Sequence, residues 1–397
     1  MVWGIQLRIE DPVAKDYDQR ALEMHAEWHG KVDYQAKSIV TNHDELSVVY
    51  TPGVAAPCLE IEKHPEKARL LTGIGNLVAV ITDGSAVLGL GDIGPQAALP
   101  VMEGKCVLFK SFAGIDAIPI ALDVHTVDEI VATVKAIAPS LGGINLEDIK
   151  APICFEVEAQ LHDALDIPVM HDDQHGTAVV ALAGLINALK VTGRTAKDTR
   201  TVMLGAGASS IAVAKLFRKY GVENIAMLDS KGLLCDDRDD LNPYKQEIAA
   251  WSEFKKNSDG SIPQISDVIK GADLFIGLSG PGLVTQEDIA SMNKDAMVFP
   301  MANPTPEIMP ELAAAAGAAI IATGRSDFPN QINNALGFPG IFRGLLDAQI
   351  EKVEDQHKLA AAKAIAGFVK NPTADEIVPS IFAPGLADAV AEAVKSA

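Results

Sequence analysis

Hydrophobic residues along the chain form short continuous runs, separated by stretches in which they recur every three or four positions. Continuous runs predict buried strands, and the recurrence predicts amphipathic helices, as at residues 126–138. Because the two patterns alternate, we predict an α/β fold. The strands predicted in the first half cover residues 48–50, 77–82, 86–90, 106–109, 118–122 and 167–170.

The second half contains a pattern typical of dinucleotide-binding domains. A predicted strand at 201–204 leads into Gly205 and Gly207, and a predicted helix follows at 208–220. The next strand ends at Asp229, 24 residues after Gly205, where an acid can bind ribose hydroxyls. Ser210 replaces the third glycine, so the prediction depends on this context. Further strands are predicted at 274–278, 297–301 and 319–322, and C-terminal helices at 359–369 and 386–394.

Two acidic pairs follow predicted strands of the first half. Asp172 and Asp173 come after residues 167–170, and Glu147 and Asp148 come after a shorter apolar stretch. Each pair alone could cap a helix or lie in solvent. A strand–helix–strand unit, however, returns the chain to the same edge of a sheet. The pairs would then converge, and their oxygen atoms would suit Mg²⁺ or Mn²⁺.

Two further side chains are candidates for proton transfer. Lys105 lies at the edge of the predicted strand at 106–109, where a lysine is usually solvated. If it is buried instead, its pKa can fall far enough for it to act as a base. Tyr50 lies where a predicted strand meets the turn at Thr51 and Pro52, and by itself it resembles a packing residue.

Length and charge narrow the class of protein. A chain of 397 residues predicts two domains, and a net charge of −20 argues against a nucleic-acid or anionic-membrane partner. The chain contains no apolar run of 18 residues, so we predict no membrane-spanning helix. Residues 1–10 do not resemble a secretory signal. The four cysteines are widely spaced, which predicts a reducing, cytoplasmic setting.

Six motifs together resemble malic enzyme, in its short bacterial and archaeal form. They follow in order from residue 50 to residue 307 and read YTPGVA, DGSAVLGLGDIGP, INLEDIKAP, HDDQHGTA, GAGAS and ANPTPE. The resemblance covers the chain from about residue 21 onward. It implies oxidative decarboxylation of L-malate to pyruvate and CO₂, with NAD or NADP and a divalent metal. It also implies a homodimer, with a metal and substrate domain of mixed sheet at 1–183 and a Rossmann-like domain with C-terminal helices at 184–397.

The resemblance also implies roles for individual residues. Lys105 would be the base, Asp172 would support it, and Tyr50 would be the acid. Asn303 would contact both substrate and coenzyme, and Asn334 the substrate. Ala86 replaces an arginine that larger relatives carry, so we expect Ser85 to bind a substrate carboxylate. The metal ligands would be Glu147, Asp148 and Asp173, and the coenzyme would be bound by Gly205, Gly207, Ala208, Ser209 and Asp229.

The coenzyme prediction favours NAD, because an acid at 229 repels a 2′-phosphate, although Lys231 weakens that preference. Four alternative functions are consistent with parts of the pattern. The same site could decarboxylate oxaloacetate, or convert malate to lactate with tightly held NAD. The chain could also be a nucleotide-binding regulator without activity, or a plain 2-hydroxy-acid dehydrogenase, whose chemistry would leave the acidic pairs without a use.

Overall fold

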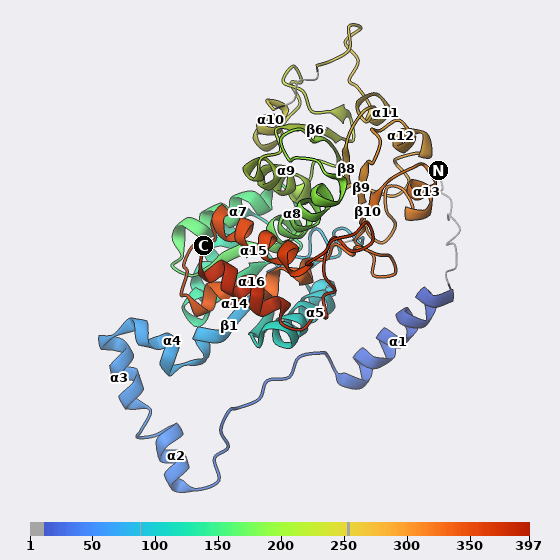
Figure 1. Ribbon diagram of the computed structural model, residues 1–397. Helices are drawn as coiled ribbons and strands as arrows, with labels where there is room; N and C mark the ends of the chain where they lie inside the picture. Colours follow the sequence, from blue (N-terminus) through green and yellow to red (C-terminus); the bar gives the residue numbers. More distant parts are fainter. Residues whose placement is uncertain (1–11, 88, 252–254) are drawn as a thin grey trace, which may run out of the picture.

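The computed structural model describes residues 12–87, 89–251 and 255–397. Figure 1 shows two lobes joined by the long helix α8 (Asp172–Thr192), with an N-terminal segment extending below them. The prediction about residues 1–10 lies outside the described residues, and the predicted strand at 86–90 lies partly outside them. The α/β class is confirmed.

The first lobe is built on a four-stranded sheet in the order β2-β1-β3-β4. Each connection between these strands contains a helix, and every strand pair is parallel, as such crossovers require. We expected a mixed sheet here; the antiparallel strand of this chain lies in the other lobe. The strands are β1 (Leu77–Thr82), β2 (Asp116–Ala121), β3 (Gly143–Leu146) and β4 (Val169–His171), and the helices are α5 (Pro95–Ala113), α6 (Val127–Ile137) and α7 (Ile153–Ala164).

The second lobe has a six-stranded sheet in the order β10-β9-β8-β5-β6-β7. The strand order reverses between β5 and β8, and ligands of such sheets bind beside that reversal. Only β7 is antiparallel. The strands are β5 (Arg200–Leu204), β6 (Asn224–Asp229), β7 (Gly232–Leu233), β8 (Leu274–Gly277), β9 (Met297–Pro300) and β10 (Ile320–Ile321). The helices are α9 (Ala208–Tyr220), α10 (Pro243–Ala249), α11 (Ile265–Val268), α12 (Gln286–Ala290) and α13 (Pro310–Ala315).

Two predicted strands are helices instead. Residues 106–109 belong to α5, in which Ala98, Met102, Cys106 and Phe109 are buried at helical spacing. A short apolar run inside a long helix resembles a strand when it is considered without its neighbours. Residues 48–50 fall at the end of α2 (His43–Val49), which begins at the capping residue Asn42. Lys105 therefore projects from a helix, and Tyr50 follows one.

Helix α8 has 15 buried residues among its 21, more than any other described helix. It packs against α9 of the second lobe and against α15 (Asp355–Phe368). The sequence predicts no membrane-spanning helix. Helix α8 is nevertheless long and apolar enough to cross a membrane, by length and composition alone. Because 72% of its most apolar window is buried within the protein, we interpret α8 as a core helix. The predicted domain boundary at residue 184 falls inside it and stays a prediction.

The C-terminal helices return to the first lobe, as Figure 1 shows. Helix α14 (Phe338–Asp347) packs against α5, where Phe109 makes edge-on contacts with Phe338 and Phe342 at centroid distances of 4.7 and 5.3 Å. Helix α16 (Leu386–Lys395) packs against α14. These contacts position the loop that precedes α14 close to the beginning of α8.

The N-terminal arm, which we define as residues 29–76, contacts α5 through the backbone N–H of Lys31, which donates to Glu103, and then extends away from both lobes (Figure 1). Its helices α2, α3 (Ala55–Lys63) and α4 (Ala68–Leu71) contain no buried residue. Several large apolar side chains of the arm are exposed, including Ile39, Val48 and Leu70. Large apolar side chains exposed in this number suggest that the arm packs against another surface. The first helix, α1 (Pro12–Trp28), precedes the arm.

Close packing of α14 on α16 generates a stability prediction. A Cβ atom at Gly340 would lie 2.7 Å from the backbone oxygen of Ala387 and from Cβ of Val390. Gly340→Ala must therefore push the helices apart, and we expect it to destabilise the fold by about 1–3 kcal/mol. The control is Gly367→Ala in α15, where a Cβ would meet no atom within 4 Å. Thermal unfolding followed by circular dichroism should show a lower melting temperature for Gly340→Ala only; equal melting temperatures would contradict the packing.

Candidate active site

The carboxyl ends of β3 and β4 bring the two acidic pairs together. These strands are paired in parallel with Leu146 opposite His171, so the residues that follow each strand are neighbours. Carboxylate oxygens of Glu147, Asp148 and Asp173 all lie within 4.8 Å of one another. The convergence expected from the strand–helix–strand unit is present, while the role of these residues as metal ligands stays a prediction.

Local contacts hold this acidic cluster in place. The backbone N–H of Asp148 donates to Oδ2 of Asp173 at 2.8 Å, and Asn145 donates to Oε2 of Glu147 at 2.7 Å. Asp148 adopts a φ of +54°, a conformation that favours glycine and that aspartate tolerates better than most residues. Non-glycine residues in this region often mark functional sites. The fully buried His171 lies 3.7 Å from Asp173.

The cluster fits a divalent cation. Burial raises the pKa of Glu147 well above its ordinary value, and the charges of Asp173, Asp172 and Asp148 add to this against the opposing effect of Lys105. Several carboxylates in one buried place repel each other, and a positive ion relieves that repulsion. Because every donor is an oxygen atom, the set suits Mg²⁺ or Mn²⁺ better than zinc.

Lys105 reaches the cluster from α5. Its Nζ lies 2.5 Å from Oδ2 of Asp172 and 2.9 Å from Oε1 of Glu147, and its side chain is only 10% exposed. Burial alone would lower the pKa of Lys105, but the charges of Asp172 and Glu147 outweigh burial and raise it. The ammonium also lies 4.5 Å from the ring centroid of Phe338. Lysine and acid are therefore in direct contact across 67 residues of sequence.

Asn334 joins this group from the second lobe. Its side-chain nitrogen donates to Oδ2 of Asp172 at 2.9 Å, and its oxygen accepts from the hydroxyl of Thr177 at 3.1 Å. The structure thus brings together Lys105, Asp172 and Asn334 around one carboxylate. The other oxygen of Asp172, Oδ1, is buried without a hydrogen-bond partner among the described residues.

Ser85 does not turn toward this group. Its hydroxyl donates to Oδ1 of Asp83 at 2.6 Å and accepts from the backbone N–H of Lys150 at 3.0 Å. These two bonds occupy the hydroxyl within the protein. The backbone N–H of the next residue, Ala86, donates to the backbone carbonyl oxygen of Asp148, so the loop packs beside the acidic cluster.

Tyr50 is not brought to the site within one chain. It caps the C-terminal end of α2, in the N-terminal arm, and is 66% exposed. Figure 1 shows α2 well separated from α5, which carries Lys105. Among the described residues, the Tyr50 hydroxyl has no hydrogen-bond partner.

The glycine turn after β5 has the form expected for a dinucleotide phosphate site. Gly205 adopts a φ of +115°, and a Cβ there would lie 2.3 Å from the backbone oxygen of Leu278. Gly207 then precedes α9, whose first residues are Ala208 and Ser209, so the helix N-terminus faces the turn. Asn303 lies on the loop after β9, and its side chain packs against Gly324.

Asp229 ends β6 as predicted, but it is held by cations. Arg238 donates to its Oδ1 at 2.9 Å and Lys245 to its Oδ2 at 2.8 Å. Burial alone would raise the pKa of Asp229, and the hydrogen bonds from these two residues lower it overall. The Nζ of Lys231 instead pairs with Asp240 at 2.6 Å. Asp229 therefore repels the 2′-phosphate of NADP less strongly than an unpaired carboxylate would.

Two supporting residues were not singled out from the sequence. Glu307 is fully buried and accepts from the backbone N–H groups of Ser279 and Ala302, so it ties together the loops after β8 and β9. Glu307 is the last residue of the ANPTPE motif, and its place in that motif is the feature of the sequence that could have identified it. Asn145, which holds Glu147, had no signal beyond its place in an apolar strand.

Close packing at the beginning of α8 generates a prediction about activity. A Cβ atom at Gly176 would lie 1.9 Å from Oδ1 of Asp172. Gly176→Ala must therefore displace the carboxylate that holds Lys105, and we expect turnover to fall about 100-fold. Gly184→Ala in the same helix is the control, because its nearest neighbour is a side-chain methyl of Ile332 at 3.3 Å. Wild-type turnover in Gly176→Ala would exclude this role for Asp172.

Comparison with known proteins identifies the family. The family model described as malic enzyme, N-terminal domain, matches residues 29–162, and that described as malic enzyme, NAD binding domain, matches residues 174–396. The bifunctional malic/malolactic enzyme of Bacillus subtilis is 52% identical over 96% of this chain and 92% of its own length. The NAD-dependent malic enzyme of Geobacillus stearothermophilus is 53% identical over 93% and 76%, respectively.

A solved structure agrees. The crystal structure of the NAD-dependent malic enzyme from Thermotoga maritima matches with a TM-score of 0.90 and 44% identity, covering 94% of this chain and 98% of that one. These matches confirm the resemblance drawn from the six motifs. The chain therefore belongs to the malic enzyme family.

Proposed function

We propose that this chain catalyses the metal-dependent oxidative decarboxylation of L-malate to pyruvate and CO₂, with reduction of NAD or NADP. The observation that carries the proposal is the contact of Lys105 with Asp172 and Glu147, beside three carboxylates that can hold a cation. A base next to a divalent metal is what oxidation at a hydroxyl-bearing carbon followed by decarboxylation needs.

Lys105 acts in the first step. Hydride leaves C2 of malate for the nicotinamide only as the C2 hydroxyl loses its proton, so a base must lie within hydrogen-bond reach. Lys105 accepts that proton in its neutral form, and Asp172 with Asn334 orients it. A divalent cation held by Glu147, Asp148 and Asp173 would oppose the ammonium form of Lys105 and polarise the keto oxygen as CO₂ leaves.

A proton must then be returned to C3 of enolpyruvate, and we assign this role to Tyr50. Because Tyr50 lies on the exposed N-terminal arm, we propose that it serves the site of a second copy in a homodimer. The exposed apolar side chains of the arm support this, since burial against another copy would remove them from water. A two-fold dimer would complete both sites by the same exchange.

The coenzyme site is proposed to accept both NAD and NADP. Asp229 can bind ribose hydroxyls, while Arg238 and Lys245 beside it can meet a 2′-phosphate. The glycine turn from Gly205 to Gly207 and the first turn of α9 would hold the pyrophosphate. Asn303 would meet the nicotinamide from the loop after β9.

A cytoplasmic setting without nucleic-acid or membrane partners is part of the proposal. All four cysteines are free, and three of them are buried. A net charge of −20 opposes binding to polyanions.

Conversion of malate to lactate is a second candidate, because the Bacillus subtilis relative is named a bifunctional malic/malolactic enzyme. The same residues would serve it, with NADH retained and reoxidised by reduction of pyruvate. Net redox change is zero in that case, so lactate would form without accumulation of reduced coenzyme. Decarboxylation of added oxaloacetate would likewise leave the coenzyme unchanged.

The first test is turnover of L-malate with Mn²⁺, with NAD and NADP in parallel. We expect equal amounts of pyruvate and reduced coenzyme, and loss of both with a chelator. Lys105→Ala should lower kcat by about 100-fold to 10,000-fold, because the base is lost. Lys110→Ala on the same helix is the control, since that side chain is 64% exposed and pairs with Asp116.

The outcomes separate the candidate reactions. Lactate without reduced coenzyme would support the malolactic reaction, and reduction without pyruvate would contradict decarboxylation. If Lys105→Ala lost only a few-fold in kcat, Lys105 would not be the base.

The dimer proposal is tested by mixing two inactive variants, Tyr50→Phe and Lys105→Ala. In a mixed dimer, Lys105 of one copy meets Tyr50 of the other, so one of the two sites is intact. Random reassociation should then restore about one quarter of wild-type activity, because half of the dimers are mixed. No recovery, despite mixed dimers detected by native mass spectrometry, would show that each chain uses its own Tyr50.

A further inference from the structure

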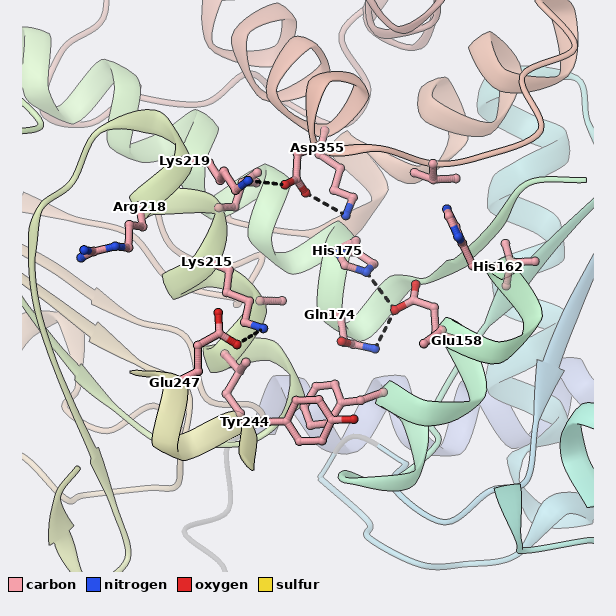
Figure 2. A pocket seen from close by; sticks show the side chains of 18 of the residues that line it. Glu158, His162, Gln174, His175, Lys215, Arg218, Lys219, Tyr244, Glu247 and Asp355 are labelled. Carbon is pink, nitrogen blue, oxygen red and sulfur yellow. Dashed lines mark hydrogen bonds and ion pairs between the residues drawn. The ribbon is translucent and has the colours of Figure 1, made fainter. Parts of the chain in front are cut away.

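A second cavity, of about 650 Å³, is lined by Gln174 and His175 at the beginning of α8 (Figure 2). Its walls come from α7 of the first lobe, from α9 and α10 of the second, and from α15. The described residues that line it include none of the predicted metal ligands and neither Gly205 nor Asp229. It is therefore separate from the site assigned to malate and coenzyme.

The cavity is rich in cations, although the chain as a whole is strongly acidic. Four lysine and arginine side chains line it against three carboxylates, in a protein of net charge −20. Lys215 pairs with Glu247 at 2.7 Å, and Asp355 lies 3.3 Å from both Lys219 and Lys358. The pairs of Lys215 and Lys219 are exposed and contribute little, because water screens them. Lys215 and Lys219, which are 40% and 63% exposed, are thus available to an incoming anion.

An aromatic and aliphatic floor completes the cavity. The rings of Phe155 and Tyr244 lie 4.2 Å apart between centroids, and Ile211, Leu216 and Val353 surround them. Figure 2 shows Lys215 on one side of the open space and His175 on the other, with the Tyr244 ring below. A planar apolar group can pack on this floor while an anionic group reaches the lysines.

We propose that this cavity binds a nucleoside phosphate as an effector, with its base on Phe155 and Tyr244 and its phosphate at Lys215 and Lys219. Its volume falls in the range that encloses ligands of drug size, larger than a four-carbon acid requires. A purely aliphatic carboxylate would leave the aromatic floor uncovered, and a bare phosphate would make no use of it.

Contacts also link the cavity to the acidic cluster. Glu158 lines the cavity and accepts from His175 at 2.9 Å, from Gln174 at 3.1 Å and from the backbone N–H of His171 at 2.7 Å. The same segment continues through Asp172 and Asp173, which face Lys105 and the acidic cluster. A ligand that moves Glu158 or His175 therefore acts on the segment that holds the predicted metal ligand Asp173.

The test is calorimetric titration with AMP as the probe, on the full chain with Mn²⁺ and saturating NAD. Saturating NAD fills the coenzyme site, so AMP cannot report on that site. We expect one AMP per chain, and at least about tenfold weaker binding in the double variant Lys215→Ala, Lys219→Ala. Lys135→Ala, exposed on α6, is the control and should bind AMP as the wild type does.

A second variant separates the base from the phosphate. Tyr244→Leu should weaken AMP and leave the binding of inorganic phosphate unchanged, because only the base uses the ring. No binding of AMP beside saturating NAD, or equal binding by the double variant, would overturn the proposal. Equal affinity for AMP and inorganic phosphate would also overturn it. None of these readouts requires turnover, so they do not depend on the reaction proposed above.

Discussion

Burial of like charges at one edge of the first sheet is the constraint on which the rest of this structure depends. Glu147, Asp148, Asp172 and Asp173 converge there, and Lys105 pairs with Glu147 and Asp172. Several carboxylates in a largely buried place repel one another, and a further cation relieves that repulsion. We therefore interpret the cluster as a metal site that the neighbouring elements hold in place.

The path of the chain serves that constraint. The β3–α7–β4 unit supplies both acidic pairs, α5 supplies Lys105, and the loop before α14 supplies Asn334 from the far end of the sequence. The beginning of α8 belongs to two sites at once, because Asp172 and Asp173 face the acidic cluster while Gln174 and His175 face the second cavity. Helix α8 also joins the two lobes.

Much of this could be predicted from the sequence, for local reasons. Parallel strands with helical crossovers end at one edge, which is why the acidic pairs could be expected to meet. The glycine turn at Gly205, between a strand and a helix, indicates a dinucleotide site. Lys105 is predicted at the edge of a strand because the apolar residues 106–109 form a short run, whereas its burial in α5 depends on contacts with α14. The helix that ends before Tyr50 could not be predicted, because α2 has no buried residue and so lacks the apolar recurrence that marks an amphipathic helix.

The central claim is that the acidic cluster is a metal site, and Mn²⁺ binding tests it most directly. Electron paramagnetic resonance of free Mn²⁺, titrated with the wild-type chain and with Asp173→Asn, measures it without any substrate. The account predicts one Mn²⁺ bound per wild-type chain, and binding weakened by about 100-fold or more in Asp173→Asn. Equal affinity in the two proteins would contradict it, because the metal would then be held elsewhere.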